Sequence, residues 1–211
     1  MKKGRVVNLN KIGNMIGIMS KNNIIIILTL IFIIGLAIGI FSFGKYDFVI
    51  NIVSNYLSKF IYLRTDSSFF RILADSLFES MIFIILSFCI GTSMFGSVAV
   101  IPIVLFKAFS YGSLVAFLYS QYNIKGIAFN AVLILPFSIF FIIALFLSCS
   151  EAIKFSFLLA NQTFDNSEYK SISLCFKNYC IRHLFILLIV LFSAIADALI
   201  SSNFINNLRL T

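Results

Sequence analysis

The sequence predicts an all-α membrane protein with about five transmembrane helices. Its 211 residues are 61% hydrophobic and only 11% charged, and the mean hydropathy is +1.05. A soluble core of this size could not bury so much apolar surface. Several stretches also reach the roughly 20 apolar residues that cross a bilayer. We therefore expect a single helical membrane domain over residues 23–203.

Apolar stretches define the predicted spans. They cover residues 23–43, 75–95, 98–119, 127–149 and 184–200. The first follows a basic segment, residues 1–22, but it is too long for a signal peptide and lacks a small-x-small cleavage site, so we expect an uncleaved anchor. Only Gly96 and Ser97 clearly separate the second span from the third. This spacing predicts a tight hairpin.

The basic residues of the connecting segments predict the orientation, because cytoplasmic segments collect Lys and Arg. Five lie in residues 1–22 and four in the loop 150–183, which share one side of the membrane if there are five spans. The other side carries six, with three acidic residues among them. We expect a multi-pass cell-membrane protein with a cytoplasmic N-terminus and an extracytoplasmic tail, residues 204–211.

The segment between the first two spans, residues 45–74, is too polar to cross a membrane but is strongly amphipathic. Its apolar face includes Val49, Ile52, Val53, Tyr56 and Phe60. A break at residues 65–68 predicts that a second helix begins near Phe69 and runs into the second span. The amphipathic helix either lies among lipid headgroups or offers a docking face to an extracytoplasmic partner.

Lys107 lies about ten residues into the third span, near the bilayer midplane, where an ionised side chain costs at least about 2.5–3.5 kcal/mol. It should therefore face protein. Its candidate partners are Asp197 in the fifth span and Glu79 in the second, and the depth of Asp197 is the closer match. We favour a buried structural ion pair; the other interpretation is an ion- or proton-coupled site.

Small residues indicate where helices pack closely in a membrane. The candidates are Gly35, Gly39, Gly91, Gly96 and Gly112. Gly35 and Gly39 form a small-xxx-small step, which also raises self-association of the chain as a hypothesis. Pro102 and Pro136 lie within the third and fourth spans, where a kink is tolerated only if neighbouring groups satisfy the backbone, so we expect both in the interior of the bundle.

The sequence contains no motif of a hydrolase or of a phosphate-binding loop. The only histidine, His183, borders a predicted span, and we expect no serine to be activated by a buried histidine. Cys175, Cys180 and His183 offer three ligands at unfamiliar spacing, whereas structural zinc takes four. We expect no enzyme activity, cofactor or metal site. The +8 charge is spread along connecting segments and does not indicate a nucleic-acid partner.

Residues 86–136 resemble the stage II sporulation protein M family of bacterial membrane proteins. The likeness is carried by the small-residue turn at 91–96, Pro102, Phe106-Lys107-Ala108, Gly112, Gly126 and Leu135-Pro136. The chain length, the number of spans and Asp197 in the fifth span also agree. Family members often place Gln or His directly after the proline of the fourth span, where this chain has Phe137.

The resemblance implies a membrane scaffold of the engulfment machinery in endospore formation. A protein of this family would hold the peptidoglycan-degrading D and P proteins at the septum, and the hydrolysis would belong to those partners. The alternative is a transporter or permease subunit with an intramembrane site at Lys107 and Asp197, which predicts a water-accessible polar cavity.

Overall fold

The computed structural model describes residues 21–164 and 172–204, and the described residues are helical apart from short turns. The helices are α2 (Lys21–Phe43), α3 (Asp47–Asp66), α4 (Phe69–Gly91), α5 (Gly96–Phe129), the π-helical turn η1 (Asn130–Ile134), α6 (Leu135–Phe164) and α7 (Ile172–Phe204). Most of the predicted N-terminal segment and of the C-terminal tail lies outside the described residues. The predicted all-α membrane fold is confirmed.

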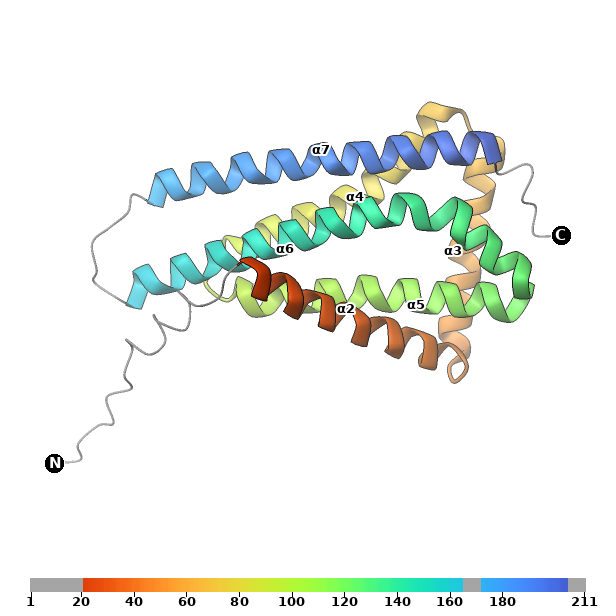
Figure 1. Cartoon of the computed structure of the whole chain (residues 1–211), viewed down its shortest axis with the longest axis horizontal. Coiled ribbons are helices and arrows are strands. Elements are labelled where there is room, and N and C mark those ends of the chain that lie inside the picture. Colours follow the sequence, from red (N-terminus) through yellow and green to blue (C-terminus); the bar gives the residue numbers. More distant parts are fainter. Residues whose placement is uncertain (1–20, 165–171, 205–211) are drawn as a thin grey trace.

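The long helices α2, α4, α5, α6 and α7 lie alongside one another in a bundle (Figure 1). Helices α2, α5 and α7 run in one direction, and α4 and α6 run in the other. Helix α2 packs mainly against α5, whereas α7 packs against α4 and α6. Helix α3 crosses one end of the bundle, here called the α3 end. The α4–α5 turn lies at the opposite end.

Four helical segments of the described chain are long and apolar enough to cross a membrane. They are Asn23–Phe43, Phe69–Gly91, Gly96–Thr163 and Ile172–Asn203. The third has 68 residues, which would measure about 100 Å as one straight helix, far more than the roughly 30 Å of bilayer hydrocarbon. It makes two passes, because α5 and α6 run in opposite directions (Figure 1). Residues 21–164 and 172–204 therefore contain five helical passes of sufficient length and hydropathy.

The chain reverses near Asn123, whose backbone has φ 49° and ψ −128°. Asn is enriched among the non-Gly residues that adopt positive φ, but this ψ lies outside the left-handed helical region, so the backbone at the reversal is strained. After the reversal, η1 widens the helix just before Pro136, which lies in the first turn of α6 and has no N–H to donate. The Ser138 hydroxyl donates to the Ile134 carbonyl oxygen at 2.6 Å.

The two prolines differ in burial. Pro136 is half-buried, but Pro102 is exposed, against the expectation that both lie in the interior of the bundle.

The apolar core has two parts. The larger runs through the middle of the bundle and includes Leu28, Ile84, Val104, Leu145 and Val190. The smaller lies beneath α3, where Val53, Leu57 and Phe60 meet Phe117, Phe129 and Leu133. Helix α3 contributes Val53, Leu57 and Phe60 to the second part, so burial of these side chains helps to hold α3 on the bundle.

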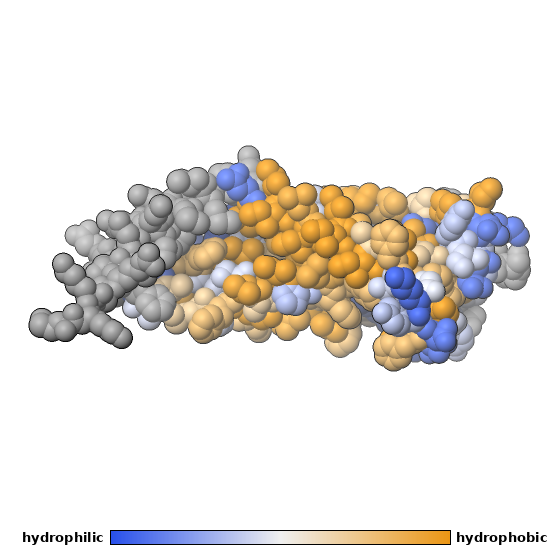
Figure 2. Space-filling view, turned by 90° about the horizontal axis from the view of Figure 1, so that it is seen from below, coloured by the Kyte–Doolittle hydropathy of each residue, from blue (hydrophilic) through white to orange (hydrophobic). Residues whose placement is uncertain are grey.

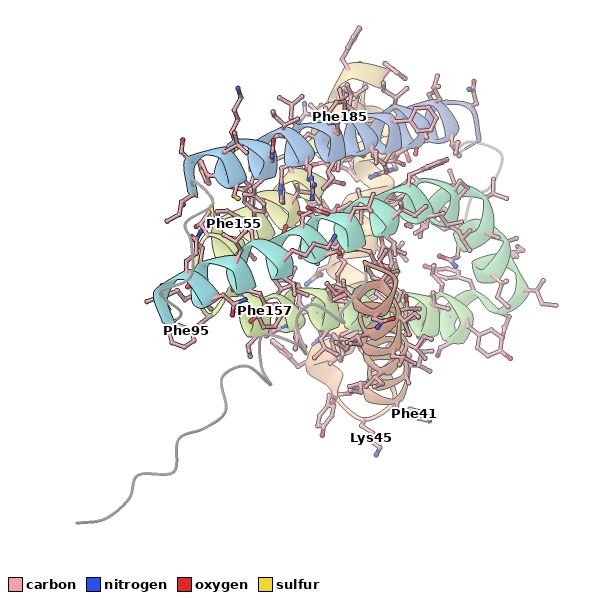
Figure 3. The ribbon with its side chains drawn as sticks, turned by 60° about the vertical axis from the view of Figure 1, so that its left-hand side comes forward. Phe41, Lys45, Phe95, Phe155, Phe157 and Phe185 are labelled. Carbon is pink, nitrogen blue, oxygen red and sulfur yellow. The ribbon has the colours of Figure 1, made fainter. Side chains whose placement is uncertain are left out.

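Large apolar side chains also cover the outside of the bundle. Phe41 on α2 and Phe185 on α7 are 74% and 61% exposed and point away from the bundle, whereas Phe155 points between helices (Figure 3). Figure 2 shows apolar residues over the middle of one face and hydrophilic residues towards the α3 end. A continuous apolar surface of this kind is suited to lipid rather than to water.

Several helices extend beyond the predicted spans. Helix α4 begins at Phe69, as expected for a helix that runs into the second span. Helix α6 continues to Phe164 and α7 begins at Ile172, so most of the predicted loop 150–183 is helical. The local reason is that this stretch keeps apolar residues such as Phe155 at helical spacing, and these pack between α6 and α7.

Candidate functional site

Helix α3 lies across the bundle with its apolar face turned inwards. Val53, Leu57 and Phe60 are only 7%, 3% and 5% exposed. Their spacing of three or four residues places them on one side of the helix. That side contacts the outer parts of α5 and η1.

This arrangement corrects the expectation that the apolar face is free to dock a partner. Of the predicted docking residues, Val53 and Phe60 are buried in the protein and Val49 is partly buried against the same core. Ile52 and Tyr56 stay exposed, at 50% and 40%. The physical reason is that an amphipathic helix gains from any apolar surface, and here the bundle itself provides one.

Arg64 continues the buried side of α3 and forms an ion pair with Asp197 of α7. Nη2 of Arg64 contacts Oδ2 of Asp197, and Nε lies 3.4 Å from Oδ1. The exposed fractions of the two side chains are 3% and 0%. The Ser76 hydroxyl donates to Oδ2, and the Ser201 hydroxyl donates to Oδ1 at 3.0 Å. A buried pair is tolerated when its remaining hydrogen-bonding capacity is met in this way.

Lys107 of α5 pairs with Glu79 of α4 beside the first pair. Nζ of Lys107 lies 2.9 Å from Oε1 of Glu79. The Tyr56 hydroxyl donates to both carboxylate oxygens of Glu79, at 3.2 and 3.1 Å. Burial of this hydroxyl end, and then the charge of Glu79, raise the pKa of the Tyr56 phenol well above its usual value, so it remains a donor.

Aromatic rings surround the Lys107 ammonium group. The centroids of the Phe83, Phe141 and Tyr111 rings lie 4.6, 5.0 and 5.4 Å from Nζ. Ring faces attract a cation, so these contacts offset part of its lost hydration. The Lys107 side chain is 10% exposed and that of Glu79 is 39% exposed. This pair is therefore less deeply buried than Arg64 and Asp197.

The observed pairing overturns the expectation that Asp197 is the closer match for Lys107. Asp197 bonds to Arg64, and Lys107 bonds to Glu79. The predicted partners are all residues of the spans. Arg64 belongs to α3, which is not a span but lies against α7 and brings Arg64 next to Asp197. The Lys107–Asp197 site of the transporter interpretation is therefore not formed as one unit.

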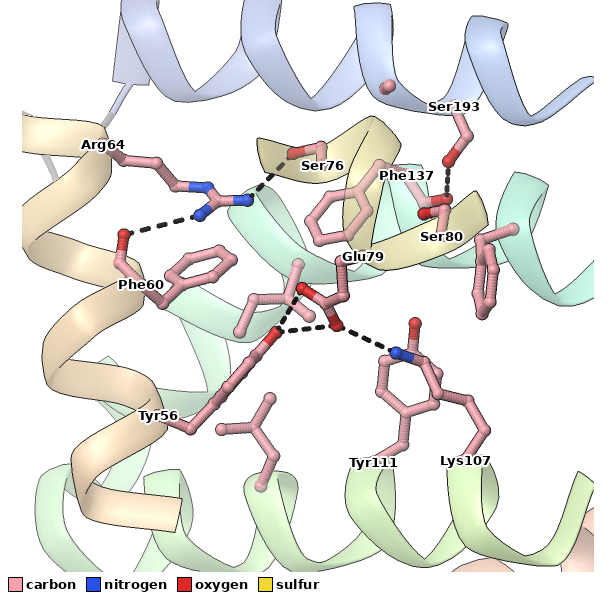
Figure 4. A pocket seen from close by; sticks show the side chains of 14 residues that line it. Tyr56, Phe60, Arg64, Ser76, Glu79, Ser80, Lys107, Tyr111, Phe137 and Ser193 are labelled. Atoms are coloured by element: carbon pink, nitrogen blue, oxygen red, sulfur yellow. Dashed lines mark hydrogen bonds and ion pairs between the residues drawn. The ribbon is translucent and has the colours of Figure 1, made fainter. Parts of the chain in front are cut away.

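Lys107, Glu79 and Arg64 line one cavity of about 30 Å³ beneath α3 (Figure 4). Figure 4 shows Tyr56 and Lys107 directed at Glu79 from opposite sides. Since one water needs roughly 10–15 Å³ of such volume, the cavity has room for on the order of two water molecules. Phe137, the residue directly after Pro136, also lines it.

Glycines allow α2 and α5 to approach closely. A Cβ atom at Gly39 would lie 2.3 Å from the carbonyl oxygen of Phe109, and one at Gly112 would lie 2.3 Å from that of Leu36. A Cβ at Gly35 would lie 2.7 Å from the Cβ of Ala108. The small-xxx-small step of α2 thus packs within the chain. Self-association of the chain stays a prediction, and it would have to use a surface other than these glycines.

Gly91 and Gly96 allow close packing at the opposite end of the bundle. A Cβ at Gly91 would lie 2.3 Å from the Tyr179 hydroxyl and 2.8 Å from Ala152. A Cβ at Gly96 would lie 2.2 Å from the Ile90 carbonyl oxygen, within the α4–α5 turn. Both glycines therefore lie where backbone and side chains leave no space for a larger residue.

A buried serine–histidine contact at this end corrects the premise that no serine has a buried histidine beside it, since His183 is 4% exposed. Nε2 of His183 lies 3.0 Å from the Ser148 hydroxyl oxygen, which also contacts that of Ser87. Nδ1 of His183 lies 3.1 Å from the Tyr179 carbonyl oxygen. Ser87 and Ser148 are fully buried and neither lines a described cavity. A substrate has no access to this serine in the described structure.

Within residues 21–164 and 172–204, no group of three or more His, Cys, Asp or Glu side chains is placed to hold a metal ion. The four cysteines are free thiols. Cys175 and Cys180 are half-buried side chains of α7.

Sequence reasoning missed Arg64 as a site residue because it was counted among the loop charges. A signal was present: Arg64 follows Val53, Leu57 and Phe60 at spacings of three and four residues, so it continues the apolar stripe of α3. A cation on an apolar stripe requires a buried acid as partner. Ser76, one helical turn before Glu79, gave no comparable signal.

The model of the stage II sporulation protein M family matches residues 26–202. This range includes every passage through the bundle and both ion pairs. Comparison with curated proteins and with solved structures gives no significant match. The match covers most of the chain, and the chain belongs to the stage II sporulation protein M family.

Proposed function

We propose that this protein is a non-catalytic membrane scaffold that recruits and anchors peptidoglycan-degrading proteins at the septum during engulfment in endospore formation. The family match supports a role as a sporulation membrane protein. The partners proposed from the family resemblance are the D and P proteins, which would carry out the hydrolysis.

The observation that carries the non-catalytic scaffold role is the internal pairing of the membrane charges. Arg64 pairs with Asp197 and Lys107 pairs with Glu79. The cavity that Arg64, Lys107 and Glu79 line has a volume of only about 30 Å³. Charges that are satisfied by one another serve to fix α3, α4, α5 and α7 in one arrangement. A fixed arrangement is what a scaffold needs to present a surface to partners.

A transporter or permease subunit is the alternative, and the exposure of Glu79 is the one observation that favours it. Its side chain is 39% exposed beside the cavity. The cavity, however, has room for only about two waters, and Asp197, the second residue of the hypothesised site, bonds to Arg64. A transport site would need space for its solute next to these charges.

The proposed orientation has a cytoplasmic N-terminus, so that α3 lies on the extracytoplasmic side. Of the six basic residues counted on that side, Arg64 is buried and paired with Asp197. Counted along the sequence, nine basic residues fall in the two segments proposed as cytoplasmic and six on the other side, and this excess supports the proposed orientation. Peptidoglycan lies outside the membrane, which is where α3 would meet proteins that degrade it.

The outward face of α3 is the proposed docking surface, since its inward face is buried. It presents Phe48, Ile52 and Tyr62, which are 74%, 50% and 65% exposed. Aromatic residues of this kind dominate the energy of protein interfaces.

Co-isolation from sporulating cells tests this proposal. A tagged chain, crosslinked in intact cells and then purified from solubilised membranes, is expected to recover peptidoglycan-degrading proteins, and Phe48→Asp is expected to reduce the recovery at least fivefold. Phe95→Asp is the matched control, because Phe95 is 79% exposed but lies at the opposite end. Recovery of no peptidoglycan-degrading protein by the unaltered chain contradicts the scaffold role, and equal loss in both variants contradicts the docking surface.

A further inference from the structure

A second cavity lies at the opposite end of the bundle, between α6 and α7. Its volume is about 160 Å³, several times that of the cavity beneath α3. Its lining includes Glu151, Lys154 and Leu158 of α6 and Asn178, Tyr179 and Arg182 of α7. We call it the α6–α7 pocket.

The α6–α7 pocket contains more positive than negative charge. Nζ of Lys154 lies 2.9 Å from Oε1 of Glu151, and Nη1 of Arg182 lies 2.5 Å from Oε2. Two cations thus share one carboxylate, which leaves one net positive charge. A guanidinium group has five N–H donors and an ammonium group has three, so two carboxylate oxygens cannot engage them all.

The exposure of the three charged side chains is graded. Glu151 is 13% exposed, Lys154 is 31% exposed and Arg182 is 58% exposed. The carboxylate therefore lies at the base of the α6–α7 pocket, and the cations reach towards its open side. An anion that enters would meet the cations first.

One wall of the α6–α7 pocket is rigid. The Tyr179 ring stacks between Phe88 and Phe155, with centroid separations of 5.0 and 4.5 Å. The Tyr179 hydroxyl donates to the Phe88 carbonyl oxygen of α4 at 2.9 Å, so this hydrogen is not available to a ligand. This wall is therefore fixed by packing within the protein before any ligand binds.

The position of the α6–α7 pocket along the bundle matches the level of lipid headgroups. It lies just beyond the apolar stretches 127–149 and 184–200, where Glu151, Lys154 and Arg182 bring charge to both helices. Basic pockets between transmembrane helices at this level bind acidic lipid headgroups. Leu158 in the lining adds an apolar contact for the non-phosphate part of such a ligand.

We propose that the α6–α7 pocket binds a phosphate group, carried by an acidic phospholipid or by a soluble phosphate. Arg182 and Lys154 donate to the phosphate oxygens, and the Asn178 amide supplies a further donor. Planar guanidinium donors match phosphate oxygens in pairs. Glu151 holds the two cations in place when the α6–α7 pocket is empty and competes with the phosphate for the same donors.

Lipid titration of the full chain in a neutral detergent, followed by native mass spectrometry, tests the proposal. Phosphatidylglycerol is expected to bind more tightly than phosphatidylcholine, and Arg182→Gln to weaken that binding about fivefold, as for loss of one basic residue near a headgroup. Lys177→Gln is the matched control, because Lys177 is exposed on the same helix but outside the lining. Glu151→Gln is expected to strengthen binding, since it removes the competing carboxylate.

Thermal unfolding with phosphatidylglycerol or inorganic phosphate separates the two sources. If only phosphatidylglycerol stabilises the chain, the ligand is a lipid headgroup. If inorganic phosphate also stabilises it, a free phosphate ion is sufficient for binding. Lys154→Gln repeats the test if Arg182→Gln does not fold. Equal binding of both lipids excludes the lipid headgroup as the source. The proposal is overturned if neither phosphatidylglycerol nor inorganic phosphate stabilises the chain, if Lys177→Gln loses as much affinity as Arg182→Gln, or if Glu151→Gln weakens binding.

Discussion

Asp197 and Lys107 carry single charges at membrane depth, but their surroundings differ. Asp197 is fully buried and accepts hydrogen bonds from Arg64, Ser76 and Ser201. Lys107 meets Glu79, whose side chain is 39% exposed. Loss of a partner should therefore be more costly at the first pair, because the charge left behind cannot reach water.

Asp197→Asn is expected to lower the free energy of unfolding by about 3–5 kcal/mol, because it leaves Arg64 charged and without its counter-ion in the protein interior. Chemical unfolding of the purified chain in detergent measures this loss. The double variant Arg64→Met, Asp197→Leu removes both charges and should recover most of the stability. If the double variant is less stable than Asp197→Asn, the charge argument fails.

Lys107→Met is expected to cost less than the roughly 3–5 kcal/mol of a fully buried pair, since the Glu79 side chain left behind is 39% exposed and Tyr56 still donates to it. Cells that carry this variant should complete engulfment, which membrane-dye imaging during sporulation measures. A transporter that uses Lys107 would instead lose function while its stability stayed nearly unchanged. That outcome would favour the alternative over the scaffold.

At the scale of elements, the closest approach involves α2 and α5, where glycines leave space for backbone. Gly39→Ala is expected to destabilise the chain by about 1–3 kcal/mol, as overpacking does, since its Cβ would lie 2.3 Å from the Phe109 carbonyl oxygen. Unfolding in detergent measures the change. Gly44→Ala is the control, because its Cβ would meet nothing within 4 Å. Equal stability of the two variants would contradict the packing.

The position of α3 could not be predicted from its amphipathic pattern. A helix with Val53, Leu57 and Phe60 on one side gains equally from headgroups, from a partner or from its own bundle, and periodicity does not distinguish the three. The identity of the covering surface depends on long-range contacts with Phe117 and Leu133. By contrast, Gly39 as a packing residue was predictable, because close helix contact in a membrane requires small side chains.

The paired charges illustrate the same limit. That Lys107 faces protein followed from the cost of an ion in lipid. That Glu79 is its partner did not follow, because the choice depended on α3 supplying Arg64 to Asp197. The burial of His183 was missed for a related reason: α7 begins at Ile172, so His183 lies within a packed helix and not at its start.

At the scale of the whole molecule, the orientation is testable by labelling. In a variant with the four native cysteines replaced by Ser, we expect Ile52→Cys to react with a membrane-impermeant maleimide on intact cells and Val53→Cys not to react. Ile52 is 50% exposed and Val53 is 7% exposed. Lys177→Cys should react only after the cells are permeabilised. Labelling of Lys177→Cys on intact cells would reverse the proposed orientation.

The central claim is that this chain supports engulfment as a scaffold, and deletion of its gene in the native host tests it most directly. Spore formation is followed with a membrane dye, with the unaltered chain restored as a control. The account predicts that the septum forms but that the mother-cell membrane fails to migrate around the forespore. Normal migration of the membrane in the deleted strain would contradict it.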